Sequence, residues 1–136
     1  MADQSVTLWW ESKGLVFRGG ADGGPEVVVD GDGKAGASPM QTLLLALSGC
    51  MAADMVDIMN KGRTPVAALE VRLEGDRAAE PPRRYTRIHM RISAAGVSDA
   101  DVDKLERALE LSRTTYCSVL HSLRPDVEMT FELERR

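Results

Sequence analysis

Residues 38–62 read SPMQTLLLALSGCMAADMVDIMNKG, and this stretch decides the fold of the 136-residue chain. Its first residue, Ser38, is a favourable N-cap, Pro39 suits the first helical position, and Gln41 lies where a capping box places its partner. Its last residue is a glycine, which commonly ends a helix. The stretch therefore predicts one long helix. Because residues 43–47 are apolar on nearly every side, we expect this helix in the core.

The middle of this helix carries Cys50, one of only two cysteines in the chain. A membrane span needs about 20 consecutive apolar residues. Ser48, Gly49 and Asp54 interrupt the apolar run, so we expect no membrane insertion. The N-terminus lacks a basic region followed by an apolar run, which indicates no signal peptide and a cytoplasmic protein. In that reducing compartment the two cysteines are expected as free thiols.

Length and composition indicate one domain over residues 1–136. The hydrophobic content is 43% and the charged content 28%, as in ordinary globular proteins. The net charge of −4 argues against nucleic acid as a partner.

The segment before the helix predicts three strands separated by turns, at Ser5–Glu11, Leu15–Phe17 and Glu26–Asp30. The glycine-rich residues 19–24 are interpreted as a hairpin turn, because they lack the spacing of a phosphate-binding loop. Residues 30–34, DGDGK, resemble the opening of a calcium loop. The twelfth position of such a loop is not a glutamate here, so we expect no calcium site.

The segment after the helix alternates between apolar and polar residues, which predicts a hairpin formed by residues 66–74 and 84–93. An amphipathic helix capped by Ser98 follows and runs to about Tyr116, and a last strand covers residues 126–134. Strands adjacent in sequence are expected to pair antiparallel, with the helices on one face of the sheet. This order indicates an α+β chain rather than a βαβ chain.

The apolar helix needs more cover than this small chain provides. One sheet can cover one side of it and the second helix part of another. We therefore expect an obligate homodimer with the Cys50 helix at its centre.

The two thiols allow four interpretations. They could be inert core thiols, or a metal site that combines Cys50 and Cys117 with His89 and His121. They could also form a Cys–His nucleophile for acyl transfer, or a reacting and a resolving cysteine in redox chemistry. Local reasoning favours Cys117 as the thiolate, because a helix starts there and its free N–H groups attract an anion.

Two segments resemble the OsmC/Ohr family. Residues 38–51, SPMQTLLLALSGCM, resemble the family's signature helix, and residues 116–119, YCSV, resemble the segment of its second cysteine. The chain is most similar to a less-studied branch with W-x-E-G-like and K-G-R segments. The counterparts here are Trp10-Glu11 with Gly14, and Lys61-Gly62-Arg63.

The resemblance implies an OsmC-like α+β fold in which an antiparallel sheet packs on a long central helix of an intertwined homodimer. It implies reduction of organic hydroperoxides or hydrogen peroxide without a cofactor or metal. Cys50 would be the peroxidatic residue and Cys117 the resolving one, and a dithiol reductant would reopen their disulfide. An arginine held by a glutamate would stabilise the Cys50 thiolate.

The chain departs from this pattern at the start of the signature helix. Met40 and Gln41 follow Pro39 where the family has an acidic residue, and Arg18 is the only arginine before the helix. Neither Met40 nor Gln41 can form an ion pair with an arginine. The alternative function is therefore a non-catalytic dimer that binds a small apolar ligand around Cys50.

Overall fold

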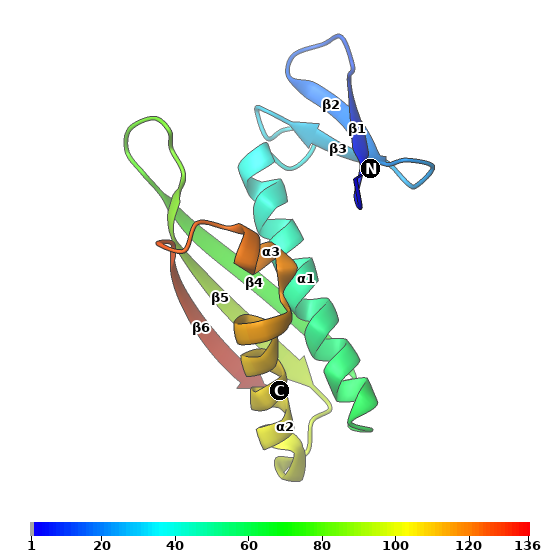
Figure 1. Cartoon of the computed structure of the whole chain (residues 1–136), viewed down its shortest axis with the longest axis vertical. Coiled ribbons are helices and arrows are strands. Elements are labelled where there is room, and N and C mark those ends of the chain that lie inside the picture. The colour runs from blue at the N-terminus through cyan, green and yellow to red at the C-terminus, as the bar shows by residue number, and fades with distance from the viewer. Residues whose placement is uncertain (1) are drawn as a thin grey trace. The chain divides into compact units, whose positions relative to one another are not determined.

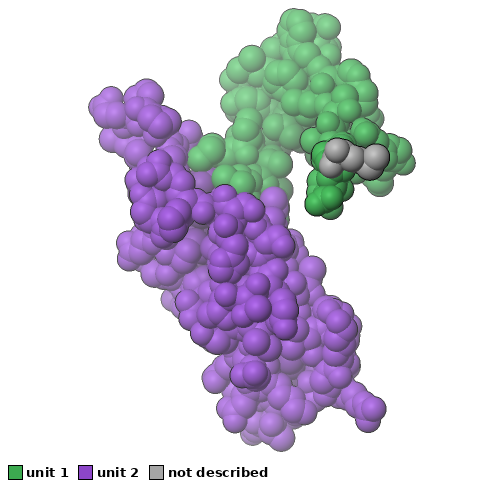
Figure 2. All heavy atoms as spheres, viewed as in Figure 1, with its two compact units in different colours: residues 1–45 green, residues 46–136 purple. Residues whose placement is uncertain are grey.

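The computed structural model describes residues 2–136, and its chain forms two compact units, residues 1–45 and 46–136 (Figure 2). The first unit contains three strands and the start of the long helix. The second contains the rest of that helix, three further strands and the shorter helices. The elements in chain order are β1 (Val6–Trp10), β2 (Val16–Ala21), β3 (Val27–Asp30), α1 (Pro39–Lys61), β4 (Ala68–Arg77), β5 (Tyr85–Ala95), η1 (Asp99–Asp101), α2 (Val102–Leu111), η2 (Ser112–Tyr116), α3 (Ser118–Ser122) and β6 (Glu128–Arg135) (Figure 1).

The sheet of the first unit is antiparallel, in the order β1-β2-β3. β2 continues through Gly19 and Gly20, which the sequence analysis placed in a turn. A Cβ on Gly19 would overlap the carbonyl oxygen of Thr7, and one on Gly20 would overlap that of Pro25. These glycines therefore allow neighbouring backbone to approach β2 closely, and the turn lies after them.

Asp30 organises the loop between β3 and α1. Its Oδ1 accepts the N–H of Asp32 at 2.9 Å, and its Oδ2 accepts those of Lys34 at 3.1 Å and Ala35 at 2.8 Å. The backbone N–H groups of Ala35 and Asp32 hold the pKa of this carboxyl below its usual value. The DGDGK segment thus uses its first carboxylate to order its own backbone.

The capping box predicted for α1 is present. The Ser38 Oγ accepts the N–H of Gln41 at 3.1 Å, and the Gln41 Oε1 accepts the N–H of Ser38 at 2.9 Å. The helix ends at Lys61, one residue before the expected glycine. The local signals therefore placed both ends of α1 correctly.

The sheet of the second unit is mixed, with the order β4-β5-β6. β4 and β5 form the predicted antiparallel hairpin, but β6 runs parallel to β5. The expectation of a purely antiparallel sheet was wrong. The connection from β5 to β6 passes through α2, η2 and α3, which is long enough for the crossover that parallel pairing requires.

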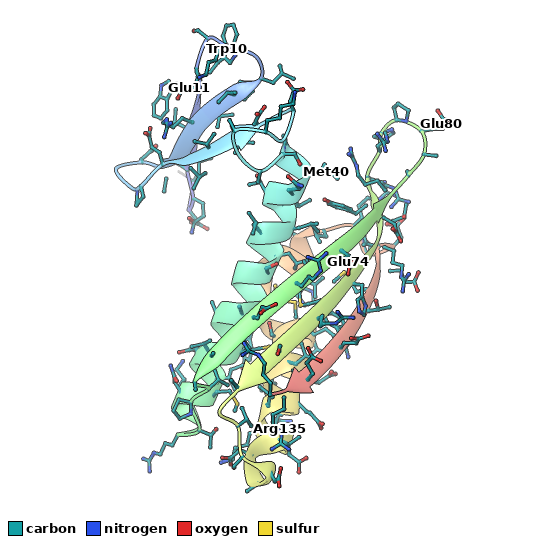
Figure 3. All side chains as sticks on the ribbon, turned by 180° about the vertical axis from the view of Figure 1, so that it is seen from behind. Trp10, Glu11, Met40, Glu74, Glu80 and Arg135 are labelled. Carbon is teal, nitrogen blue, oxygen red and sulfur yellow. The ribbon has the colours of Figure 1, made fainter. Side chains whose placement is uncertain are left out.

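One face of this sheet carries the core of the second unit, and α1 and α2 lie on that face (Figure 1). Figure 3 views the sheet from its other side, where Glu74 lies. The buried residues of α1 recur every fourth position, and the large aliphatic residues buried in the middle of β5 recur every second position. They are Leu47, Met51, Met55 and Met59 on α1, and Ile88, Met90 and Ile92 on β5.

Within the chain only one face of α1 is buried in this way, which agrees with the expectation that this small chain cannot cover the apolar helix by itself. Val56 is 37% exposed. By length and composition alone α1 is also able to cross a membrane, as are core helices of many soluble proteins. The interruptions at Ser48, Gly49 and Asp54 therefore do not exclude a span by length and composition.

We predict that Asp30→Ala destabilises the β3–α1 loop, because three backbone N–H groups lose their acceptor. Hydrogen–deuterium exchange should quicken at residues 32, 34 and 35 and change little in β4–β6. Asp30→Asn keeps an acceptor oxygen and should have a smaller effect. Because the pKa of Asp30 is lowered in the folded chain, the stability it contributes should be lost as pH falls through that pKa. Unchanged exchange in the alanine variant would contradict this role.

Candidate functional site

Three side chains of the second unit converge where α1 passes the segment between η2 and α3. The Sγ atoms of Cys50 and Cys117 and a carboxylate oxygen of Asp54 all lie within 4.8 Å of one another. Cys50 and Asp54 are four residues apart on α1 and therefore share a face. Both cysteines are free thiols. The structure thus brings together the two predicted site residues and adds a carboxylate.

Ser112 holds Asp54 in this cluster. Its hydroxyl donates to the Asp54 Oδ2 at 2.8 Å, and the residue is fully buried. Ser112 begins η2, a π-helical turn that replaces the regular helix predicted up to Tyr116. Wider turns of this kind are frequent at functional sites. Here the turn leads directly into Cys117, whose N–H donates to the Ser112 carbonyl oxygen at 2.9 Å.

Neither Asp54 nor Ser112 was predicted as a site residue from the sequence. The signal for Asp54 was present, because it is the first charged residue of α1 and lies one turn after Cys50. Ser112 carries no such signal. It lies 58 residues after Asp54 in the sequence, and only the fold brings the two side chains together.

Burial raises the pKa of the Cys117 thiol to about 11. The N–H of Leu120 donates to its Sγ at 3.4 Å and opposes this shift, whereas Cys50 and Asp54 reinforce it. Cys117 does precede a helix, as expected, but that helix has five residues. The local argument that made Cys117 the favoured thiolate was therefore wrong, because it omitted the cost of burying a charge.

The two thiols differ in access to solvent. Cys117 is 0% exposed, whereas Cys50 is partly exposed. A pocket of about 400 Å³ has Asp54 in its wall and so adjoins the cluster. Its other lining residues are Asp57, Ile58, Lys61, Leu111 and Tyr116. A small molecule from solvent therefore meets Cys50 before Cys117.

The two histidines of the chain do not join this cluster. The His89 Nδ1 lies 2.6 Å from the Thr130 Oγ1, and its Nε2 lies 3.6 Å from a carboxylate oxygen of Glu132. His121 is exposed. Within residues 2–136 the group able to hold a metal consists of both cysteines and Asp54, without a histidine. The structure therefore supports neither a metal site that includes the two histidines nor a Cys–His nucleophile.

The residues considered for the activating ion pair have other partners. The Arg18 Nε donates to the Glu11 Oε1 at 2.9 Å within the first unit. Gln41 forms the capping box, as expected. The carboxylate beside Cys50 comes instead from Asp54, one turn further along the same helix.

Comparisons with known proteins agree on one family. The pattern of the family described as OsmC-like protein matches residues 31–132. Protein YhfA of Escherichia coli K12 is 38% identical over 134 residues, which cover 96% of each chain. A hypothetical protein of Aquifex aeolicus VF5 is 28% identical, with a TM-score of 0.85 over 100% of this chain and 98% of its own. An organic hydroperoxide resistance protein of Elizabethkingia anophelis shares the fold at 14% identity and a TM-score of 0.66, over 100% and 98% of the two chains.

We predict that an alkylating reagent such as iodoacetamide modifies Cys50 much faster than Cys117 in the folded, reduced chain near neutral pH. Cys117 is buried and its pKa of about 11 leaves almost no thiolate there. Mass spectrometry of peptides from a time course would measure both rates. In urea the two rates should become similar, because unfolding removes the burial. Equal rates in the folded chain would contradict the assigned environment of Cys117.

Proposed function

The chain belongs to the OsmC-like protein family, and on this premise we propose that it reduces organic hydroperoxides or hydrogen peroxide with its two cysteines. The observation that carries the proposal is the approach of the Cys50 and Cys117 Sγ atoms to within 4.8 Å. Proteins that share the fold are described as organic hydroperoxide resistance proteins, which supports the reaction class.

Cys50 is proposed as the peroxidatic residue because it is the thiol with access to solvent. Its thiolate attacks one peroxide oxygen, so that an S–O bond forms, the O–O bond breaks and the other oxygen leaves as an alcohol or water after taking up a proton. Cys50 is then a sulfenic acid. Cys117 attacks this sulfur, a disulfide forms, and the hydroxyl leaves as water. An external dithiol, present in a reducing cytoplasm, reduces the disulfide by exchange.

The electrostatics of the pair favour this order of events. Cys50 raises the pKa of Cys117 through both a hydrogen bond and its charge. Once Cys50 is a neutral sulfenic acid, it no longer raises the pKa of Cys117 through a negative charge. Cys117 therefore becomes easier to deprotonate after Cys50 has been oxidised, which suits a resolving residue.

A non-catalytic, ligand-binding dimer is the second candidate function. Two observations favour it: the acid expected at the start of α1 is replaced by Met40 and Gln41, and a pocket of about 400 Å³ adjoins the cluster. In that case the ligand binds beside the cluster, in the pocket that Asp54 lines, and the thiols do not turn over.

A homodimer is part of the proposal. Only 22% of the most apolar stretch of α1 is buried by the chain itself. Trp9, Trp10, Val56 and Tyr116 are exposed as well. A second copy covering such surfaces would remove them from water, which is the main driving force of obligate association.

We predict that the wild-type chain consumes cumene hydroperoxide or hydrogen peroxide in the presence of a dithiol. Cys50→Ser should reduce the rate to the uncatalysed background, because the attacking sulfur is gone. Cys117→Ser should stop after one oxidation per chain, because Cys50 then has no partner. Ser118→Ala, at the exposed position next to Cys117, should retain the wild-type rate. Equal rates in the wild type and Cys50→Ser would refute the peroxidase and favour the ligand-binding dimer.

The proposed homodimer can be tested separately from the peroxidase activity. Sedimentation equilibrium should give twice the 14.8 kDa mass of one chain at micromolar concentration. Val56→Lys should shift the equilibrium toward the single chain, because a charge would be buried against an apolar partner surface. Glu70→Lys, on an exposed position of β4, serves as the matched control. A wild type that sediments as a single chain would contradict the dimer.

A further inference from the structure

We propose that the reduced chain binds one soft divalent cation, Zn²⁺ or Cd²⁺, through the Sγ atoms of Cys50 and Cys117 and a carboxylate oxygen of Asp54. Thiolate sulfur is the ligand that selects such ions, and a carboxylate oxygen is a common additional ligand of zinc. The inference goes beyond the proposed function and does not depend on peroxide turnover.

The spacing of the three donor atoms suits a tetrahedral ion. Zinc–sulfur bonds of about 2.3 Å and zinc–oxygen bonds of about 2.0 Å place neighbouring ligand atoms roughly 3.5–3.8 Å apart. The Sγ atoms and the carboxylate oxygen here lie within 4.8 Å of one another. A contraction of about 1.3 Å or less, within reach of side-chain rotation, would complete the set.

Two further groups already orient the ligands. The Ser112 Oγ donates to one Asp54 oxygen at 2.8 Å, which leaves the other oxygen for an ion. The Leu120 N–H donates to the Cys117 Sγ at 3.4 Å, a contact that favours a thiolate over a thiol. Outer contacts of this kind fix the ligands of protein metal sites and tune their affinity.

An ion from solvent can reach the cluster, and its fourth coordination position stays open to water. Cys50 and Asp54 are partly exposed, and Asp54 also lines a pocket of about 400 Å³. Three protein ligands leave the fourth position of a tetrahedral ion to water. Each coordinating thiol loses its proton to the buffer, so binding of one ion releases two protons and changes no oxidation state.

The same two sulfurs cannot bind an ion and form a disulfide at once. Binding therefore requires the reduced chain, and oxidation of the pair releases the ion. The ion would in turn protect both thiols from oxidation while it is bound.

The test is a titration of the full-length reduced chain with Cd²⁺ in the absence of peroxide, followed by the ultraviolet thiolate-to-cadmium absorption band. We expect saturation at one Cd²⁺ per chain. Cys50→Ser and Cys117→Ser should each lose most of the band and weaken binding. Asp54→Asn can still accept the Ser112 hydrogen bond and should weaken binding about tenfold or more, as removal of a ligand charge does.

Asp57→Asn is the matched control, because Asp57 lines the same pocket one turn nearer the helix end without belonging to the cluster. Its affinity should stay within about twofold of wild type, since only an exposed ion pair with Lys61 is lost. Thermal melts confirm that each variant is folded. Any of three outcomes would contradict the proposed metal site. They are the absence of the absorption band, saturation at half an ion per chain, and equal weakening of binding by Asp54→Asn and Asp57→Asn. A peroxide assay that shows no turnover would contradict the proposed peroxidase but not the metal site.

Discussion

The second unit depends on the burial of one stripe of α1. Leu47, Met51, Met55 and Met59 are 0–1% exposed and follow one another at intervals of four residues. An α-helix turns about 100° per residue, so positions three residues after Leu47 and Met51 lie about 60° to one side of the stripe. Cys50 and Asp54 occupy these positions. They therefore lie at the edge of the core, where a side chain is shielded but still accessible.

The same constraint produces two unequal thiols. Cys50 shares the edge of the core with Asp54, while Cys117 enters the core from the opposite segment and is completely buried. Burial raises the pKa of Cys117, and the neighbouring sulfur and carboxylate add to this effect. A pair of identical side chains thereby acquires one accessible member and one protected member, which is the asymmetry that a two-cysteine reaction needs.

The carboxylate beside the two sulfurs does not come from the start of α1, where the resemblance implied an acid. Met40 and Gln41 stand where an acid was expected, and Gln41 completes the capping box. Asp54 instead approaches the sulfurs from the C-terminal side of Cys50. Arg18, the only arginine before α1, is bonded to Glu11 within the first unit. Asp54 provides an oxygen ligand beside two sulfurs, and so links thiol chemistry with metal binding.

Several features could be predicted from the sequence alone because they depend on local interactions. The capping box and the terminal glycine defined α1, and strict alternation defined the β4–β5 hairpin, because neighbouring residues determine both. The two cysteines could likewise be named as the site. Their pairing, the bond between Ser112 and Asp54 and the parallel course of β6 required the tertiary structure. Each joins segments far apart in the chain, and burial of Cys117 outweighed the local effect of its helix, since desolvation depends on everything that surrounds a group.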